Sequence, residues 1–249
     1  KKFIIKEMKH KIVIFYGREV GHEIYKTLKN EKSIEIIHSI EVGKKKDLTQ
    51  NFNKKKIKES WDCIYRKLKK FNNFTIITAW WGFIIPSKIL KLSKKNTINL
   101  HPSFLPYGRG KYSNVWAIIN KEPFGATICS LSSGIDCGRI YIQKKLNYDL
   151  FDTAEDLYIR SVKELISLFK RNYKKILAGG VSSKKSIING SYYSSSRIKN
   201  LRKLQINKRY RLSELIKRIN ALTFSGYPKA YFIKNKKKYS LEIKILKQN

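Results

Sequence analysis

The sequence predicts an α/β fold, in which a doubly wound, mostly parallel sheet is followed by a small C-terminal α+β subdomain. Two observations lead to this prediction. Over residues 1–180, short apolar runs typical of buried strands alternate with stretches of helical periodicity. Over residues 181–249 the chain becomes more polar and offers only a short helix and two strands. We therefore expect a domain boundary near Gly180.

The first hundred residues contain four predicted strands with helices between them. The run KIVIFYG at residues 11–17 is apolar and ends in glycine, as expected of a buried parallel strand. Further strands are predicted at 33–42, 74–81 and 96–101, and helices at 18–30, 57–68 and 87–93, the last with a serine cap. The Lys-rich residues 43–56 are predicted to form a solvated loop.

The next segment contains two strands, at 125–132 and 139–146, and then the strongest helix signal in the chain. Cap chemistry at the helix start comes from Asp152, Thr153 and Asp156. Its apolar stripe consists of Leu157, Val162, Leu165, Ile166 and Phe169, and paired glycines end the helix at 177–180. The C-terminal subdomain is predicted to contain a helix at 213–222 and a hairpin formed by 226–233 and 237–246.

The charge of the chain leaves two interpretations open. With 54 Lys and Arg against 18 Asp and Glu, the formal net charge is +36, which would suit a nucleic-acid partner. The basic residues are mostly Lys, however, and are spread along the whole chain among Ile and Asn, which favours a compositional origin. We therefore do not expect nucleic acid to be a partner.

Other classes of protein are disfavoured by composition. A hydrophobic content of 42% supports a folded core, and no apolar run approaches the roughly 18 residues that a membrane span needs. The opening residues are basic and then apolar, but Lys interrupts them and no cleavage site follows, so we expect a cytoplasmic protein. Cys63, Cys129 and Cys137 lack the spacing of a disulfide framework or a metal site, and no metal is expected.

Ligands of open α/β sheets bind outside the carboxyl ends of the strands. The residues predicted to lie there are 17–18, 80–85, 99–101 and 133–138. They contain no GxGxxG, P-loop or GxSxG motif, which removes the usual support for dinucleotide, nucleotide triphosphate and serine-hydrolase sites. They do contain an amide, an imidazole and a carboxylate.

Asn99 and His101 are two residues apart on one predicted strand, so their side chains share a face. Pro102 favours an extended conformation at His101, and Asp136 lies in a Gly-bracketed loop that can approach the same space. An amide donor, a histidine and an aspartate together can stabilise an oxyanion and move a proton. Taken alone, the same residues also suit a structural histidine and a turn aspartate.

The combination of motifs resembles the folate-dependent formyltransferases, which have a Rossmann-like fold. That family's pattern is Asn-x-His-Pro-Ser-Leu-Leu-Pro, then a Gly and Thr segment, then Asp-x-Gly. The matching residues here are Asn99, His101, Pro102, Ser103, Leu105, Pro106, Gly125, Thr127, Asp136 and Gly138, with Phe104 in place of one Leu.

The resemblance implies a mechanism and a formyl donor, N10-formyltetrahydrofolate. Asn99 and His101 would polarise the formyl oxygen while an amine attacks, and Asp136 would keep His101 in its useful protonation state. Neither a metal nor a nicotinamide cofactor is implied. The pterin would be bound, largely through backbone groups, by Trp81, Gly82, Phe83, Ile84, Ile85, Ser133, Gly134 and Ile135.

Within the family, the segment PYGRGKYSNVWAI and the short C-terminal subdomain most resemble enzymes that formylate nucleotide-linked amino sugars. The expected substrate is dTDP-4-amino-4,6-dideoxyglucose or its 3-amino isomer, used for O-antigen and other surface glycans, and the expected assembly is a homodimer. The substrate residues would be Gly17, Arg18, Ser103, Tyr107, Arg109, Lys111, Tyr112, Phe224 and Tyr227. Two alternatives stay open: a methionyl-tRNA formyltransferase without its C-terminal barrel, and a basic nucleic-acid-binding protein with an inert transferase core.

Overall fold

The computed structural model describes residues 9–42, 54–93, 96–185 and 189–246, without the side chains of 54–60. Within them, one six-stranded sheet has the order β2-β1-β3-β4-β6-β7. Its strands are β1 (His10–Gly17), β2 (Ile34–Val42), β3 (Phe74–Ala79), β4 (Thr97–His101), β6 (Phe124–Cys129) and β7 (Ile140–Leu146). The first four strands pair in parallel, and β6 and β7 add an antiparallel edge. This confirms the predicted α/β class and mostly parallel sheet.

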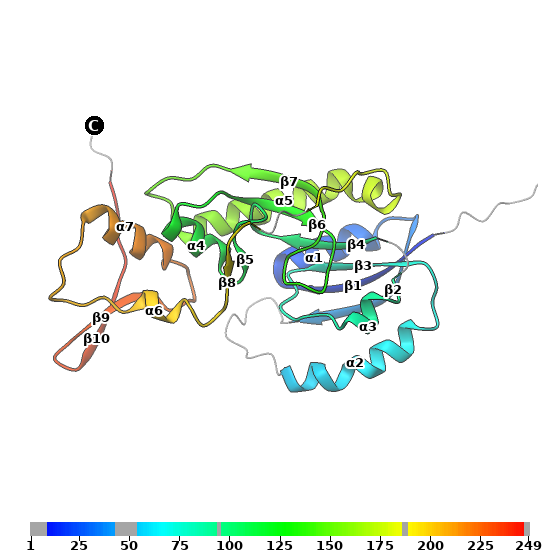
Figure 1. The fold of residues 1–249 in the computed structure, drawn as a ribbon, viewed down its shortest axis with the longest axis horizontal. Helices are drawn as coiled ribbons and strands as arrows, with labels where there is room; N and C mark the ends of the chain where they lie inside the picture. The colour runs from blue at the N-terminus through cyan, green and yellow to red at the C-terminus, as the bar shows by residue number, and fades with distance from the viewer. Residues whose placement is uncertain (1–8, 43–53, 94–95, 186–188, 247–249) are drawn as a thin grey trace, which may run out of the picture.

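Helices cover both faces of the sheet (Figure 1). α1 (Arg18–Lys29) and α5 (Ala154–Leu177) lie on one face, and α2 (Lys54–Leu68) and α3 (Ser87–Leu90) lie on the other. Alternation along β1 explains how one strand serves both layers. Ile12, Ile14 and Tyr16 belong to the cluster under α1 and α5, whereas Val13 and Phe15 belong to the cluster under α2 and α3.

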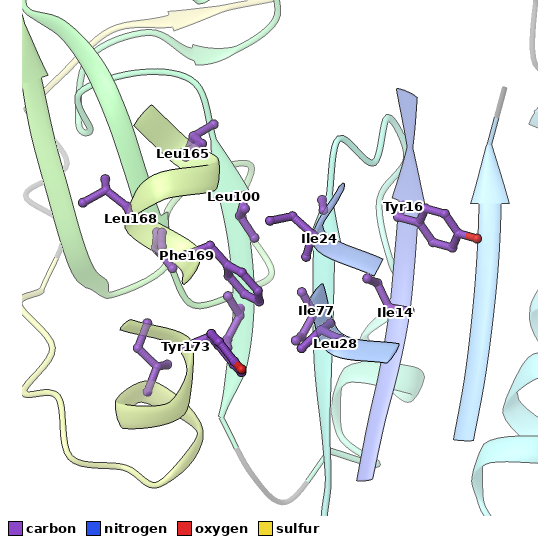
Figure 2. Packing of buried hydrophobic residues seen from close by; sticks show 14 of the residues in the cluster. Ile14, Tyr16, Ile24, Leu28, Ile77, Leu100, Leu165, Leu168, Phe169 and Tyr173 are labelled. Atoms are coloured by element: carbon purple, nitrogen blue, oxygen red, sulfur yellow. The ribbon is translucent and has the colours of Figure 1, made fainter. Parts of the chain in front are cut away.

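Helix α5 is the main support of the first face. The predicted capping box is present, since Thr153 and Asp156 exchange side-chain and backbone hydrogen bonds at its start. Leu165 and Phe169 point from α5 toward the sheet, across from Ile24 of α1 (Figure 2). Each buried side chain of this size stabilises the fold by about 1.5–3 kcal/mol relative to exposure.

Several element boundaries differ from the predictions. Helix α2 begins at Lys54, so residues 54–56 are helical rather than part of a loop, while residues 43–53 lie outside the described part. The serine cap of the third helix is wrong, because Pro86 is the N-cap and Ser87 is the first helical residue. Helix α4 (Ser113–Asn120) was not predicted, nor were the short elements β5 (Arg109–Gly110), β8 (Tyr192–Tyr193) and α6 (Lys199–Arg202).

The C-terminal part contains the predicted helix, α7 (Leu212–Ala221), and the predicted hairpin of β9 (Ala230–Lys234) and β10 (Lys237–Leu241). It packs onto the N-terminal part through a cluster that joins α4 and the start of α5 to α7 and β9. Ile118 and Leu157 meet Ile219 and Leu222 there. The boundary near Gly180 stays a prediction. In the described residues, no helix combines the length and the apolar character needed to cross a membrane.

Candidate active site

Three polar side chains meet at the carboxyl end of β4. Asn99 and His101 come from the strand itself, and Asp136 comes from the loop between β6 and β7. The Asn99 amide donates from Nδ2 to Asp136 Oδ1 at 3.2 Å, and His101 Nδ1 lies 3.6 Å from the same oxygen. His101 is only 7% exposed. The structure thus brings together the three predicted catalytic residues, whose roles stay predictions.

Backbone groups of the segment after β4 complete the cluster. The Gly108 carbonyl oxygen lies 3.1 Å from His101 Nε2, and the Gly110 N–H donates to Asp136 Oδ2 at 3.0 Å. Asp136 has φ +51°, a left-handed conformation that costs energy for a non-glycine residue and is common at functional sites. Each side-chain oxygen of Asp136 therefore accepts a hydrogen bond, and both ring nitrogens of His101 face an oxygen.

A hydrogen bond from the neighbouring strand β3 orients the amide of Asn99. Thr78 on the neighbouring strand donates to Asn99 Oδ1 at 2.7 Å, so that the Asn99 NH2 group faces Asp136. Cys129 lies on the other side of Asn99, and burial raises the pKa of its thiol, which stays neutral. Asn99 and His101 converge on one anionic oxygen. Two such groups can equally donate to the oxygen of a carbonyl that becomes an oxyanion.

The predicted pterin-binding residues fall in two loops beside this cluster. In the first loop, the rings of Trp81 and Phe83 contact each other and Trp81 also contacts Phe15, so these two side chains pack on the core. Ile85 is buried and Ile84 is 70% exposed. Trp81 Nε1 is buried and makes no hydrogen bond within the described residues. Gly82 and Ile84 are exposed, so this loop leaves its backbone open to a flat ligand such as a pterin.

The second loop contributes Ser133, Gly134 and Ile135, which are exposed. They directly precede Asp136, so a ligand bound along their backbone would reach the catalytic cluster. These residues and the first loop both follow the carboxyl ends of strands, as expected for a ligand site of an open α/β sheet.

Predicted substrate residues from opposite ends of the chain meet in an aromatic cluster. Arg18, at the start of α1, donates from Nη2 to the Tyr227 hydroxyl at 2.7 Å. The Phe224 ring lies between those of Tyr158 and Tyr227, with centroid distances of 5.1 Å and 5.0 Å. Burial raises the pKa of Tyr158 although Arg18 opposes the shift. Trp80 completes the cluster at 5.1 Å from Tyr158.

The remaining predicted substrate residues are more scattered. Arg109 donates to Cys137 Sγ at 2.9 Å, next to Asp136. Lys111 is exposed, and its Nζ lies 3.6 Å from where a Cβ of Gly82 would be. Ser103 is buried, Tyr107 and Tyr112 are half-buried, and Gly17 packs closely against the end of β2. Of these, Ser103 and Gly17 are both buried.

Four features of the site were not predicted. Thr78 has a role only because the register pairs it with Asn99, and that register is not visible in the sequence. Trp80 was expected at a strand end, but its ring contact with Tyr158 of α5 was not predicted. The backbone of Gly108 and Gly110 carries no side-chain signal. Two hollows, of about 450 Å³ beside α1 and about 760 Å³ beside α7, lie away from the catalytic cluster.

A mostly parallel sheet with an amide, an imidazole and a carboxylate at the carboxyl end of β4 defines a Rossmann-like α/β protein. The family of formyl transferases matches residues 19–169, more than half of the chain, and the chain belongs to that family. A second match, to the N-formyltransferase dimerization C-terminal domain, spans residues 198–247.

Among curated relatives, the dTDP-4-amino-4,6-dideoxyglucose formyltransferase of Mycobacterium tuberculosis is 27% identical over 136 residues, 55% of this chain. The match spans only 58% of that relative. The methionyl-tRNA formyltransferase of Thermodesulfovibrio yellowstonii is 41% identical over 98 residues, 39% of this chain and 32% of the relative.

Two solved structures are similar over most of the chain. A 4-N formyltransferase from Francisella tularensis matches with a TM-score of 0.76 and 21% identity, covering 95% of this chain and 99% of the other. WlaRD, a sugar 3N-formyl transferase crystallised in the presence of dTDP and 5-N-formyl-THF, matches with a TM-score of 0.63 and 26% identity. That match covers 92% of this chain and 84% of the other.

Proposed function

We propose that the protein is an N-formyltransferase that moves a formyl group from N10-formyltetrahydrofolate to the amino group of a nucleotide-linked amino sugar. The substrate of first choice is dTDP-4-amino-4,6-dideoxyglucose, with the 3-amino isomer second, and the product would serve surface glycan synthesis. The observation that carries this proposal is the convergence of Asn99 and His101 on one oxygen of Asp136, in a chain of the formyl transferase family.

In the proposed reaction, Asn99 and His101 donate hydrogen bonds to the formyl oxygen as the sugar amine attacks. Asp136 orients both donors and accepts the proton that the amine loses, directly or through water. Thr78 prevents the Asn99 amide from turning its oxygen toward the site. The formyl donor supplies the one-carbon group: as the new bond to the sugar amine forms, the bond from the formyl carbon to N10 of the folate breaks, and Asp136 returns the proton to that nitrogen through water.

Two observations support an amino sugar over other amines. The similarity to WlaRD, described as a sugar 3N-formyl transferase, covers 92% of this chain and 84% of the other. The aromatic cluster of Phe224 and Tyr227 beside Arg18 suits a nucleotide, since rings can stack on a base and a guanidinium can meet phosphate oxygens. We further propose a homodimer through the C-terminal domain, whose family is described as a dimerization domain. The cytoplasmic location stays a prediction.

One observation favours a second candidate. The highest of the identities given above, 41% over 98 residues, is to a methionyl-tRNA formyltransferase. A tRNA substrate would also suit the net charge of +36. The match covers only 32% of that relative.

The deciding experiment incubates the purified full chain with N10-formyltetrahydrofolate and one acceptor at a time, and follows tetrahydrofolate release. The acceptors are dTDP-4-amino and dTDP-3-amino dideoxy sugars, UDP-linked amino sugars and charged initiator tRNA. We expect turnover with a dTDP-amino sugar. Turnover with the tRNA alone would replace the first proposal by the second, and salt-sensitive tRNA binding without any transfer would favour an inert core.

Variants test the catalytic roles. Asn99→Ala removes one oxyanion donor, and we expect kcat to fall by about 10²–10³-fold with little loss of folded protein. His38→Ala is the matched control, because His38 lies on β2 and away from the site. Wild-type kcat in the Asn99 variant would remove the proposed mechanism.

A further inference from the structure

A second chain segment holds the loop that completes the catalytic cluster. β5 pairs in parallel with β8, side by side in Figure 1, through backbone hydrogen bonds from Arg109 N–H to the Ser191 carbonyl at 3.0 Å and from Lys111 N–H to the Tyr193 carbonyl at 2.9 Å. Between these two bonds lies Gly110, whose own N–H donates to Asp136. The place of that N–H therefore depends on residues 191–193.

The same segment binds the loop through a side chain. The Gly108 N–H donates to Ser191 Oγ at 2.7 Å, and Ser191 Oγ in turn donates to Glu122 Oε2 at 2.6 Å. Tyr193 donates its hydroxyl to the other oxygen of Glu122. Glu122 thus binds two hydroxyls of one segment, and Ser191 restrains Gly108, the residue whose carbonyl faces His101.

Residues 190–193 approach the loop of residues 106–110 very closely. A Cβ on Gly190 would lie 2.1 Å from the Pro106 carbonyl oxygen, and a Cβ on Gly110 would lie 2.3 Å from the Tyr193 carbonyl oxygen. Only glycine allows such approaches. Tyr193 is fixed further by its ring, which stacks on Trp116 at 4.5 Å with an interplanar angle of 9°. The segment is therefore a firm support for the loop.

We propose that Ser191, held by Glu122, is a positioning residue of the formyl-transfer site. It sets the place of the Gly108 carbonyl against His101 and of the Gly110 N–H against Asp136, without touching either substrate. This inference rests on the proposed function. Ser191 lies between the two family matches, which span residues 19–169 and 198–247, so neither match assigns it a role.

Ser191→Ala tests the inference, with Ser191→Thr as the variant that retains the hydroxyl. A displacement of about 1 Å in a catalytic group can cost roughly 10²-fold in rate, so we expect kcat to fall about 10- to 100-fold in Ser191→Ala. KM for both substrates should stay within about threefold, because no substrate contact is lost. Ser191→Thr should restore most of kcat. Glu122→Gln keeps one acceptor and should lie between Ser191→Ala and the wild type.

Hydrogen exchange gives a measurement that does not depend on the substrate. In Ser191→Ala, amides of residues 105–111 should exchange about tenfold faster, the effect of losing one ordinary hydrogen bond. Tyr148→Phe is the matched control. It removes another hydroxyl next to Glu122, one that donates at 2.7 Å to the Glu122 and Ala117 carbonyls but not to the loop.

The inference is supported if Ser191→Ala lowers kcat and speeds exchange in residues 105–111 while Tyr148→Phe does neither. It is overturned if exchange in Ser191→Ala equals that of the wild type, or if Tyr148→Phe lowers kcat as much. Should the wild-type chain formylate no amino sugar, the proposed function fails. The exchange of residues 105–111 then decides by itself whether Ser191 holds the loop.

Discussion

Gly110 is a constrained glycine of the site, and its replacement by alanine tests the described geometry directly. It has φ +92°, and a Cβ there would lie 2.3 Å from the Tyr193 carbonyl oxygen. The left-handed conformation costs about 1–3 kcal/mol for alanine. Pushing β5 from β8 also weakens the Lys111 bond to Tyr193, about 1 kcal/mol, and the charge-assisted Gly110 bond to Asp136, about 1.5–3 kcal/mol.

Gly110→Ala should therefore lower the free energy of unfolding by about 3.5–7 kcal/mol. For a chain of this size the melting temperature should fall by roughly 10–20 °C. Thermal unfolding followed by circular dichroism measures it, and kcat measured well below the transition should fall as well, because Asp136 loses a partner.

Gly179→Ala is the matched control. Gly179 also has a left-handed φ, +74°, but nothing lies within 4 Å of the Cβ that alanine would add. It should show the conformational strain alone, a fall of roughly 5 °C, with unchanged kcat. Equal melting temperatures in the two variants would refute the close approach of β5 and β8.

Two further predictions concern other parts of the chain. Thr78→Val should lower kcat about tenfold, because the hydroxyl that orients Asn99 is lost while the shape of the side chain is kept. The control is Thr75→Val, on the same strand, which removes a buried hydroxyl that lacks a partner and should keep wild-type kcat. Equal rates in the two variants would contradict the role of Thr78. Glu31 accepts a hydrogen bond from Lys174, which lowers the pKa of Glu31 from about 4.5 to about 2. Because this pKa is depressed in the folded state, the ion pair stabilises folding above pH 4.5, and its contribution is lost as the pH falls toward 2. Denaturant unfolding of Glu31→Gln across that range should show a shallower loss of stability than wild type, and parallel curves would count against the contribution.

The strands and long helices were predictable because each segment is long enough to show its pattern of apolar residues. β1 is a continuous apolar run that ends in glycine, and α5 shows both its cap and its stripe. The meeting of Asn99 and His101 with Asp136 was expected from the rule that ligands bind at carboxyl ends and from the resemblance to the formyltransferases.

The supports of the site were not predictable in the same way. β5 and β8 have two residues each, too few for any period, and their pairing joins positions about 80 residues apart. Ser191 and Glu122 are ordinary polar residues whose partners are decided by packing. The cap of α3 was misjudged because Pro86, which fixes the start of the helix by its own φ, precedes the serine.

The hydrogen bond between Arg18 and Tyr227 joins a residue that is made early in synthesis to one that is made late. Its two partners are 209 residues apart, so Arg18 is synthesised long before the tyrosine that binds it. At about 5–20 residues per second, the ribosome needs roughly 10–40 s to reach Tyr227. A nascent chain can pair its first strands during that interval, but it cannot close the aromatic cluster. Binding of a substrate that needs this cluster must therefore wait until the C-terminal part has emerged.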